Sequence, residues 1–188
     1  MRTFAMAAII SFLPIKSASA HIVAGSVSSF DAGLAHPISG LDHVTAMLAV
    51  GMLAASKGGR ALWLWPLSFV GMMVMGGALG FAHMHLPYVE LGISASVVIL
   101  GIMVAFAIIP KLWAGAALIG GFAILHGHAH VSEIPHSASG LAFALGFSAA
   151  TIFLHLVGIG LAKGWKAIAR SPTGAAADFF ENLPRKRW

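Results

Sequence analysis

The chain has 188 residues, of which 59% are hydrophobic and only 9% are charged. Because soluble domains usually have about a quarter of their residues charged, this composition predicts a polytopic membrane protein. The absence of cysteine excludes disulfides, thiolate metal sites and a cysteine nucleophile. The net charge of +5 is then explained by membrane topology rather than by nucleic-acid binding.

The first twenty residues, "MRTFAMAAIISFLPIKSASA", are typical of a cleavable signal peptide. They combine a positive start, an apolar core of about ten residues, too short to span a bilayer, and a small-residue pattern that ends at Ala20. Cleavage after Ala20 would make His21 the first mature residue. A retained N-terminal anchor is the alternative.

Five later segments have the length of about 20 apolar residues that a membrane-spanning helix needs. We therefore predict an all-α protein with five spans after signal removal, a single transmembrane domain over 21–170 and a cytoplasmic tail over 171–188. The predicted spans are approximately 38–56, 61–82, 88–109, 112–130 and 138–162.

Charge divides the junctions between these spans into two groups. In a five-span arrangement the positive-inside rule places the cationic junctions and the C-terminus in the cytoplasm. The mature N-terminus and the histidine-rich junctions then face the periplasm of a bacterial inner membrane. The cationic residues are Lys57, Arg60, Lys111, Lys163, Lys166, Arg170, Arg185, Lys186 and Arg187.

The stretch "HPISGLDHVTAM" opens the first predicted span with two histidines and an aspartate. Pro37 should push His36 out of helical geometry and suits a helix start. An unpaired Asp costs about 2.5–3.5 kcal/mol at the centre of a span and less near its end, so Asp42 should seek a partner. His36, Asp42 and His43 therefore indicate a cation-binding entrance. The alternative is a carboxylate favoured by the helix dipole, beside a structural histidine.

A second cluster, "LHGHAHVSEIPH", lies at the outer end of the fourth predicted span. His126 and His130 are four residues apart, so they share a helix face and can bind one ion. His126 lies about 22 Å of helix rise beyond Lys111, at a depth similar to that of the first motif. Glu133 adds a carboxylate. These residues predict a metal site shared between two helices.

The other histidines are weaker candidates. A solvated outer loop explains His136 better and His128 equally well, and it also explains the "HMH" sequence at 83–85. His155 lies inside the last span, where ionisable residues are functional candidates, although a neutral histidine bonded to a backbone carbonyl is the alternative. The α-amine and imidazole of His21 could chelate an ion together after signal cleavage.

Imidazole and carboxylate ligands without thiolate suit Ni²⁺, Co²⁺, Zn²⁺ or Cu²⁺, and the order of metal affinities does not choose among them. Mg²⁺ would require more oxygen ligands. The residues therefore indicate a divalent transition metal without specifying which one.

The segment "HPISGLDHVTAMLAVG" resembles the signature of the HupE/UreJ family of small bacterial membrane proteins. The family pattern falls on His36, Asp42 and His43, and "LHGHAHVSE" and "ATIFLHLVG" are similar to its later motifs. The resemblance covers essentially the whole mature chain. It implies nickel uptake, or sometimes cobalt uptake, as an accessory function for hydrogenase or urease.

These observations predict a non-enzymatic permease that moves Ni²⁺ or Co²⁺ from periplasm to cytoplasm and holds no permanent cofactor. The expected metal ligands are His21, His36, Asp42, His43, His126, His130, Glu133 and His155. One rival is a b-type haem protein with histidine axial ligands from two helices. Another is a membrane metallohydrolase, which the absence of an H-E-x-x-H motif argues against.

Overall fold

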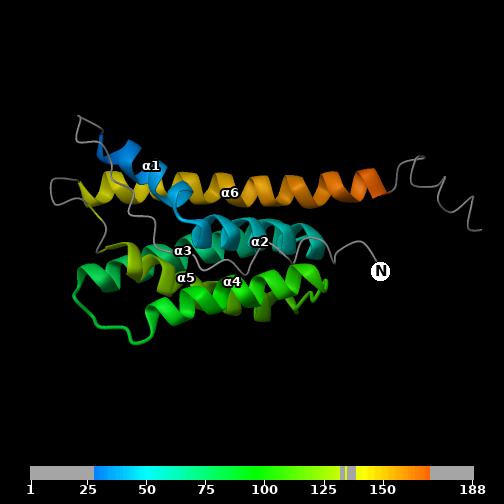
Figure 1. Ribbon diagram of the computed structural model, residues 1–188, viewed down its shortest axis with the longest axis horizontal. Coiled ribbons are helices and arrows are strands. Elements are labelled where there is room, and N and C mark those ends of the chain that lie inside the picture. The colour runs from blue at the N-terminus through cyan, green and yellow to red at the C-terminus, as the bar shows by residue number, and fades with distance from the viewer. Residues whose placement is uncertain (1–27, 132–133, 135–138, 170–188) are drawn as a thin grey trace, which may run out of the picture.

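The computed structural model describes residues 28–131, 134 and 139–169, and all the regular secondary structure in these ranges is α-helix (Figure 1). The predicted all-α class is therefore confirmed. The expected signal peptide and the expected tail lie outside the described residues. The helices are α1 (Ser29–Ser39), α2 (Leu41–Lys57), α3 (Ala61–Phe81), α4 (Val89–Ala105), α5 (Leu112–Val131) and α6 (Gly140–Ala169).

Three of these helices, α3, α5 and α6, are long and apolar enough to cross a membrane. The pair α1 and α2 would count as a fourth span, although the two helices are bent by 81° at the break between them. Helix α4 is apolar but has only 17 residues. The structure thus describes a helical membrane protein, while the predicted count of five spans stays a prediction.

The four later predicted segments coincide with α3 to α6 to within a few residues at most ends, and α6 continues well beyond the predicted end at 162. The first segment differs, because its helix begins at Leu41 and is preceded by a separate helix that the sequence did not predict. The break falls at Gly40, whose extended backbone (φ −99°, ψ 117°) ends α1 and caps α2.

Pro37 does not start a helix, and the expectation that it removes His36 from helical geometry is wrong. Both residues lie inside α1, near its C-terminal end. A proline there removes only one backbone hydrogen bond, and the helix has only two more residues before it ends. The hydroxyl of Ser39 donates to the carbonyl of His36 at 2.6 Å, which satisfies one of the carbonyls left free by that ending.

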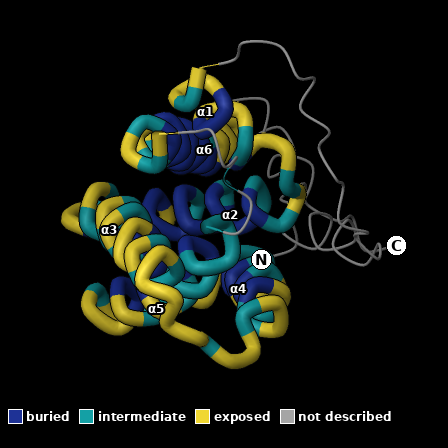
Figure 2. The backbone as a smooth tube through the Cα atoms, turned by 90° about the vertical axis from the view of Figure 1, so that its left-hand side faces the viewer, coloured by how far each residue is buried: buried dark blue, intermediate teal, exposed yellow. Residues whose placement is uncertain are grey.

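Helix α2 lies in the middle of the bundle and contacts α3, α4 and α6 (Figure 2). Its core-facing residues include Ala46, Met47 and Val50, all of which are fully buried. Helix α1 contacts the N-terminal part of α6 and lies at a steep angle to the other helices (Figure 1).

Three helix crossings are each made by two facing glycines. In every pair, a Cβ added to one glycine would collide with the backbone carbonyl three residues before the other glycine. Such close approach permits Cα–H···O contacts and is common between membrane helices. The pairs are Gly76 with Gly127 (α3 and α5), Gly51 with Gly158 (α2 and α6), and Gly33 with Gly146 (α1 and α6).

The contacts between these helices also fix their directions. Trp65 near the start of α3 donates to the carbonyl of Leu112 at the start of α5 at 2.9 Å, and Gly76 faces Gly127 further along both helices. Helices α3 and α5 therefore run in parallel. The Lys166 ammonium donates to the carbonyl of Ala55 at 3.3 Å, which ties the C-terminal ends of α6 and α2 together.

These contacts bring the lysine- and arginine-bearing helix ends to one end of the bundle, together with exposed tryptophans. Tryptophan is enriched at membrane interfaces, and cationic residues gather on the cytoplasmic side. The residues at this end are Lys57, Arg60, Lys111, Lys163, Lys166, Trp63, Trp113 and Trp165.

The substitution Gly76→Ala should destabilise the bundle, because its new Cβ would meet the carbonyl of Ile124. Overpacking of this kind typically costs about 1–3 kcal/mol. Thermal unfolding of the protein in detergent should show a clear loss. Gly71→Ala on the same helix is the matched control, since nothing lies within 4 Å of its added Cβ. Equal stability of the two variants would refute the glycine-pair crossing.

Candidate metal site

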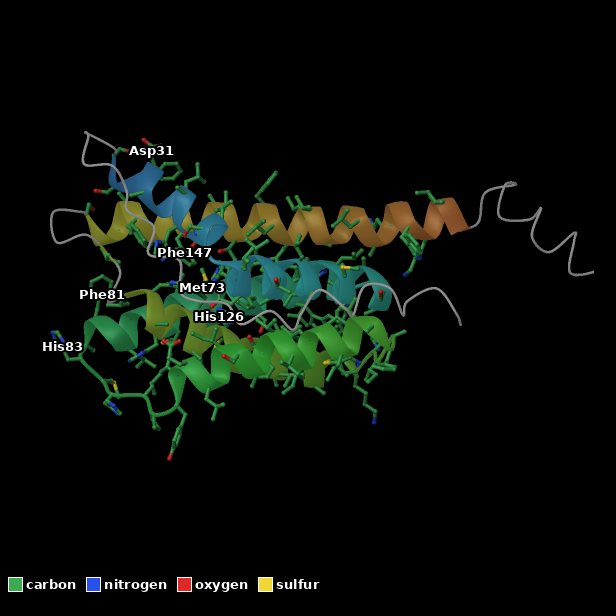
Figure 3. All side chains as sticks on the ribbon, viewed as in Figure 1. Asp31, Met73, Phe81, His83, His126 and Phe147 are labelled. Carbon is green, nitrogen blue, oxygen red and sulfur yellow. The ribbon has the colours of Figure 1, made fainter. Side chains whose placement is uncertain are left out.

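Three histidines meet inside the bundle, His43 from α2 and His126 and His130 from α5. One ring nitrogen from each lies within 4.8 Å of the others. His43 and His126 are each 1% exposed, and His130 is half-buried. His126 lies in the interior between the helices (Figure 3). The spacing of four residues places both α5 rings on the same side of that helix.

His130 connects this group to α1. Its Nε2 lies 3.1 Å from Nδ1 of His43, and its Nδ1 lies 3.1 Å from Nε2 of His36. Two nitrogens that bind one metal ion at about 2.0–2.1 Å would be about 2.9–3.3 Å apart for bond angles of about 90–109°. The pair formed by His43 and His130 could therefore exchange its hydrogen bond for an ion with little movement of either ring.

Several buried histidine nitrogens make no hydrogen bond within the described residues. They are Nε2 of His43, Nδ1 of His126 and both ring nitrogens of His155, which lies deeper on α6. A buried polar group without a partner costs about 1–3 kcal/mol and calls for an explanation. His126 could bind an ion through Nδ1 without losing any hydrogen bond.

Ser96 of α4 is the polar neighbour of His126. Its Oγ lies 2.9 Å from Nε2 of His126 and donates to the carbonyl of Ile93 at 2.6 Å. Ser96 is fully buried. The sequence analysis missed it, although a serine within the apolar run "ISASVVIL" was a signal available in the sequence.

Phenylalanine rings surround the imidazoles. Phe147 lies 5.0 Å from His43 and 4.9 Å from His130 between ring centroids. Phe69 lies 5.7 Å from His126 and 5.3 Å from His155. Phe69 is fully buried and Phe147 is 5% exposed, so both rings cover the sides of the imidazoles that they contact. The sequence analysis named neither phenylalanine, because apolar residues are expected throughout a membrane helix.

Asp42 was expected to bind the ion together with His43. Its Oδ1 accepts a hydrogen bond from the backbone N–H of His43 at 2.8 Å, at the N-terminus of α2. It does not belong to the described group of three residues whose ligand atoms lie within 4.8 Å of one another. The contact is the one expected of a carboxylate at a helix N-terminus.

His155 lies deeper in the bundle, on α6. It is 1% exposed, and its ring packs against Phe69. The expected alternative, a hydrogen bond from the ring to a backbone carbonyl, is not formed in the described part of the chain. Phe69 thus contacts the ring of His126, one of the three grouped histidines, as well as the ring of His155.

The remaining histidines differ in their surroundings. His21 and Glu133, both expected ligands, lie outside the described residues, as does His136. Nε2 of His128 donates to the carbonyl of Met84 at 2.8 Å. His83 is exposed at the end of the bundle (Figure 3).

A cavity of about 260 Å³ lies between α3, α5 and α6 and reaches His130. Its lining is apolar except for His130 and Ser148, and it includes Phe143 and Phe147. His130 therefore borders open space on one side and the buried histidines on the other.

Comparison with known proteins identifies relatives of this chain. The family model described as HupE / UreJ protein matches residues 9–180. Protein HupE of Rhizobium leguminosarum bv. viciae is 44% identical over 151 residues, which cover 78% of this chain and 79% of that protein. No solved structure matches the chain. With its motifs around His36 and His126 and a match over most of its length, the chain belongs to the HupE/UreJ family.

Proposed function

We propose that this protein is a permease that moves a divalent transition metal, nickel first and cobalt second, from the periplasm to the cytoplasm. The observation that carries the proposal is the group of three imidazoles inside an apolar bundle, with ligand nitrogens within 4.8 Å of one another. Imidazole nitrogens suit these ions. Membership of a hydrogenase and urease accessory family supports nickel as the cargo.

The proposal includes a topology of five spans, α2 to α6, in a bacterial inner membrane. In it, the signal peptide is removed after Ala20, the mature N-terminus is periplasmic and the C-terminal tail is cytoplasmic. Support comes from the cationic residues and exposed tryptophans that share one end of the bundle. The 17 residues of α4 rise about 25 Å, so α4 can cross a hydrocarbon core of about 30 Å with its flanking residues.

This topology predicts that a reporter fused after Arg170 is cytoplasmic and that one inserted near Pro135 is periplasmic. The cationic helix ends should stay inside, so the two positions should lie on opposite sides. Reporter activity in whole cells measures both positions. Two reporters on the same side of the membrane would rule out the five-span arrangement.

In the proposed path, an ion meets His36 first and then the group formed by His43, His126 and His130. The carboxylate of Asp42, at the outer end of α2, would attract the cation, and Glu133 and His21 would contribute from the outer side. His155 would receive the ion at a deeper level, beyond the ring of Phe69. Permeation needs sites that bind strongly enough for entry and weakly enough for release, which a few ligands at successive depths provide.

The proposed role is not enzymatic, and the metal is cargo rather than a permanent cofactor. A b-type haem protein is the rival that the geometry does not favour. His126 and His155 would have to serve as axial ligands, but the buried ring of Phe69 packs against both. A macrocycle between these two helices would have to displace Phe69.

Uptake of Ni²⁺ into proteoliposomes tests the proposal. The purified wild-type chain should accumulate Ni²⁺, and His126→Ala should lose at least about 90% of the rate, because it removes a buried ligand. Asp42→Asn should also lose most of the rate. A unit charge 4 Å from another gains on the order of 4 kcal/mol at an effective dielectric of 20, and losing half of that weakens a site about 30-fold.

The matched control is His128→Ala on the same helix, whose ring bonds to a backbone carbonyl outside the group of three histidines. Its uptake per inserted molecule should stay near the wild-type rate. Wild-type vesicles that accumulate no Ni²⁺, Co²⁺, Zn²⁺ or Mn²⁺ would refute permease activity. Near-normal uptake by Asp42→Asn would show that Asp42 only stabilises the start of α2 and does not attract the ion.

A further inference from the structure

The hydroxyl of Ser96 has a single hydrogen atom and two polar neighbours. It lies 2.6 Å from the carbonyl oxygen of Ile93 and 2.9 Å from Nε2 of His126. A carbonyl oxygen can only accept, so the short contact to Ile93 takes the hydrogen of the hydroxyl. The Oγ atom is then left as an acceptor toward His126, and Nε2 of His126 must carry the hydrogen of that bond.

The other nitrogen of His126 leads to the same assignment. A neutral imidazole carries one N–H, so a hydrogen on Nε2 leaves a lone pair on Nδ1. Nδ1 is buried and has no hydrogen-bond partner. The opposite tautomer would bury an N–H without an acceptor, which costs about 1–3 kcal/mol. It would also require the hydroxyl to turn from Ile93 to His126, which would leave two oxygen atoms 2.6 Å apart without a hydrogen between them.

We propose that Ser96 is a positioning residue that fixes the tautomer and the ring orientation of His126, so that Nδ1 is the nitrogen offered to the metal ion. This inference rests on the proposed function, because it assigns a role to Ser96 within the same site. Metal-binding histidines commonly donate their other ring N–H to a neighbouring acceptor, which holds the ring and raises its basicity. Ser96 is fully buried, so solvent does not replace its hydroxyl.

The tautomer can be measured without metal. In the full-length chain labelled with ¹⁵N-histidine in lipid nanodiscs, the His126 signals are assigned by their loss in His126→Gln. The wild-type spectrum should show a protonated Nε2 and an unprotonated Nδ1. Ser96→Ala should lose this preference, and Ser96→Thr, which keeps the hydroxyl, should restore it. A protonated Nδ1 in the wild type, or an unchanged spectrum in Ser96→Ala, would overturn the inference.

Binding of Ni²⁺ alone tests the consequence for the metal. Ser96→Ala should weaken the Kd about 10- to 100-fold, which is the usual effect of losing the partner of a metal-binding histidine. Ser68→Ala is the matched control, because its hydroxyl donates to the carbonyl of Ala116 at 2.9 Å near the start of α5, ten residues before His126. Equal Kd values for Ser96→Ala and Ser68→Ala would overturn the positioning role. If the wild-type protein takes up no Ni²⁺ but His126 still carries its hydrogen on Nε2, the permease function is refuted and the positioning role of Ser96 is not.

Discussion

The structure depends on imidazole rings that lie among apolar helices, with His43, His126 and His155 almost fully buried. A polar group in an apolar membrane bundle is costly unless it is paired, and intramembrane histidines are therefore functional candidates. Here His130 bonds to both His36 and His43, which joins α5 to α1 and α2, and Ser96 bonds separately to His126, which joins α4 to α5. An ion can use the unpaired Nδ1 of His126 directly, and it can replace the hydrogen bond between His43 and His130.

The glycine crossings make this arrangement possible. Gly127 follows His126 directly and packs on the carbonyl of Met73, so α5 approaches α3 at the level of the site. Gly51 packs on the carbonyl of His155, which brings α2 and α6 together at the level of the deeper histidine. Phe69 contacts rings at both levels. In the proposed path an ion that leaves the group formed by His43, His126 and His130 would have to pass the ring of Phe69 before it reaches His155.

Much of this architecture follows from the sequence. The apolar segments identified α3 to α6 because a membrane helix needs an unbroken apolar run of about 20 residues. The four-residue spacing of His126 and His130 correctly indicated that both rings lie on the same side of α5. Helix α1 was missed because Pro37 was interpreted as the start of the first span, whereas packing against α6 stabilises a separate short helix. Ser96 was missed because its partner lies 30 positions away in the chain, and spacing carries no information at that range.

The most direct test of the central claim is X-ray absorption at the nickel K-edge of the full-length chain loaded with Ni²⁺ in nanodiscs. If His43, His126 and His130 hold the ion, the spectrum should contain scattering from about three imidazole rings, with nitrogens at about 2.0–2.1 Å. His126→Gln should remove about one ring from that signal. A nickel shell composed only of oxygen atoms, or an unchanged imidazole signal in His126→Gln, would contradict the account.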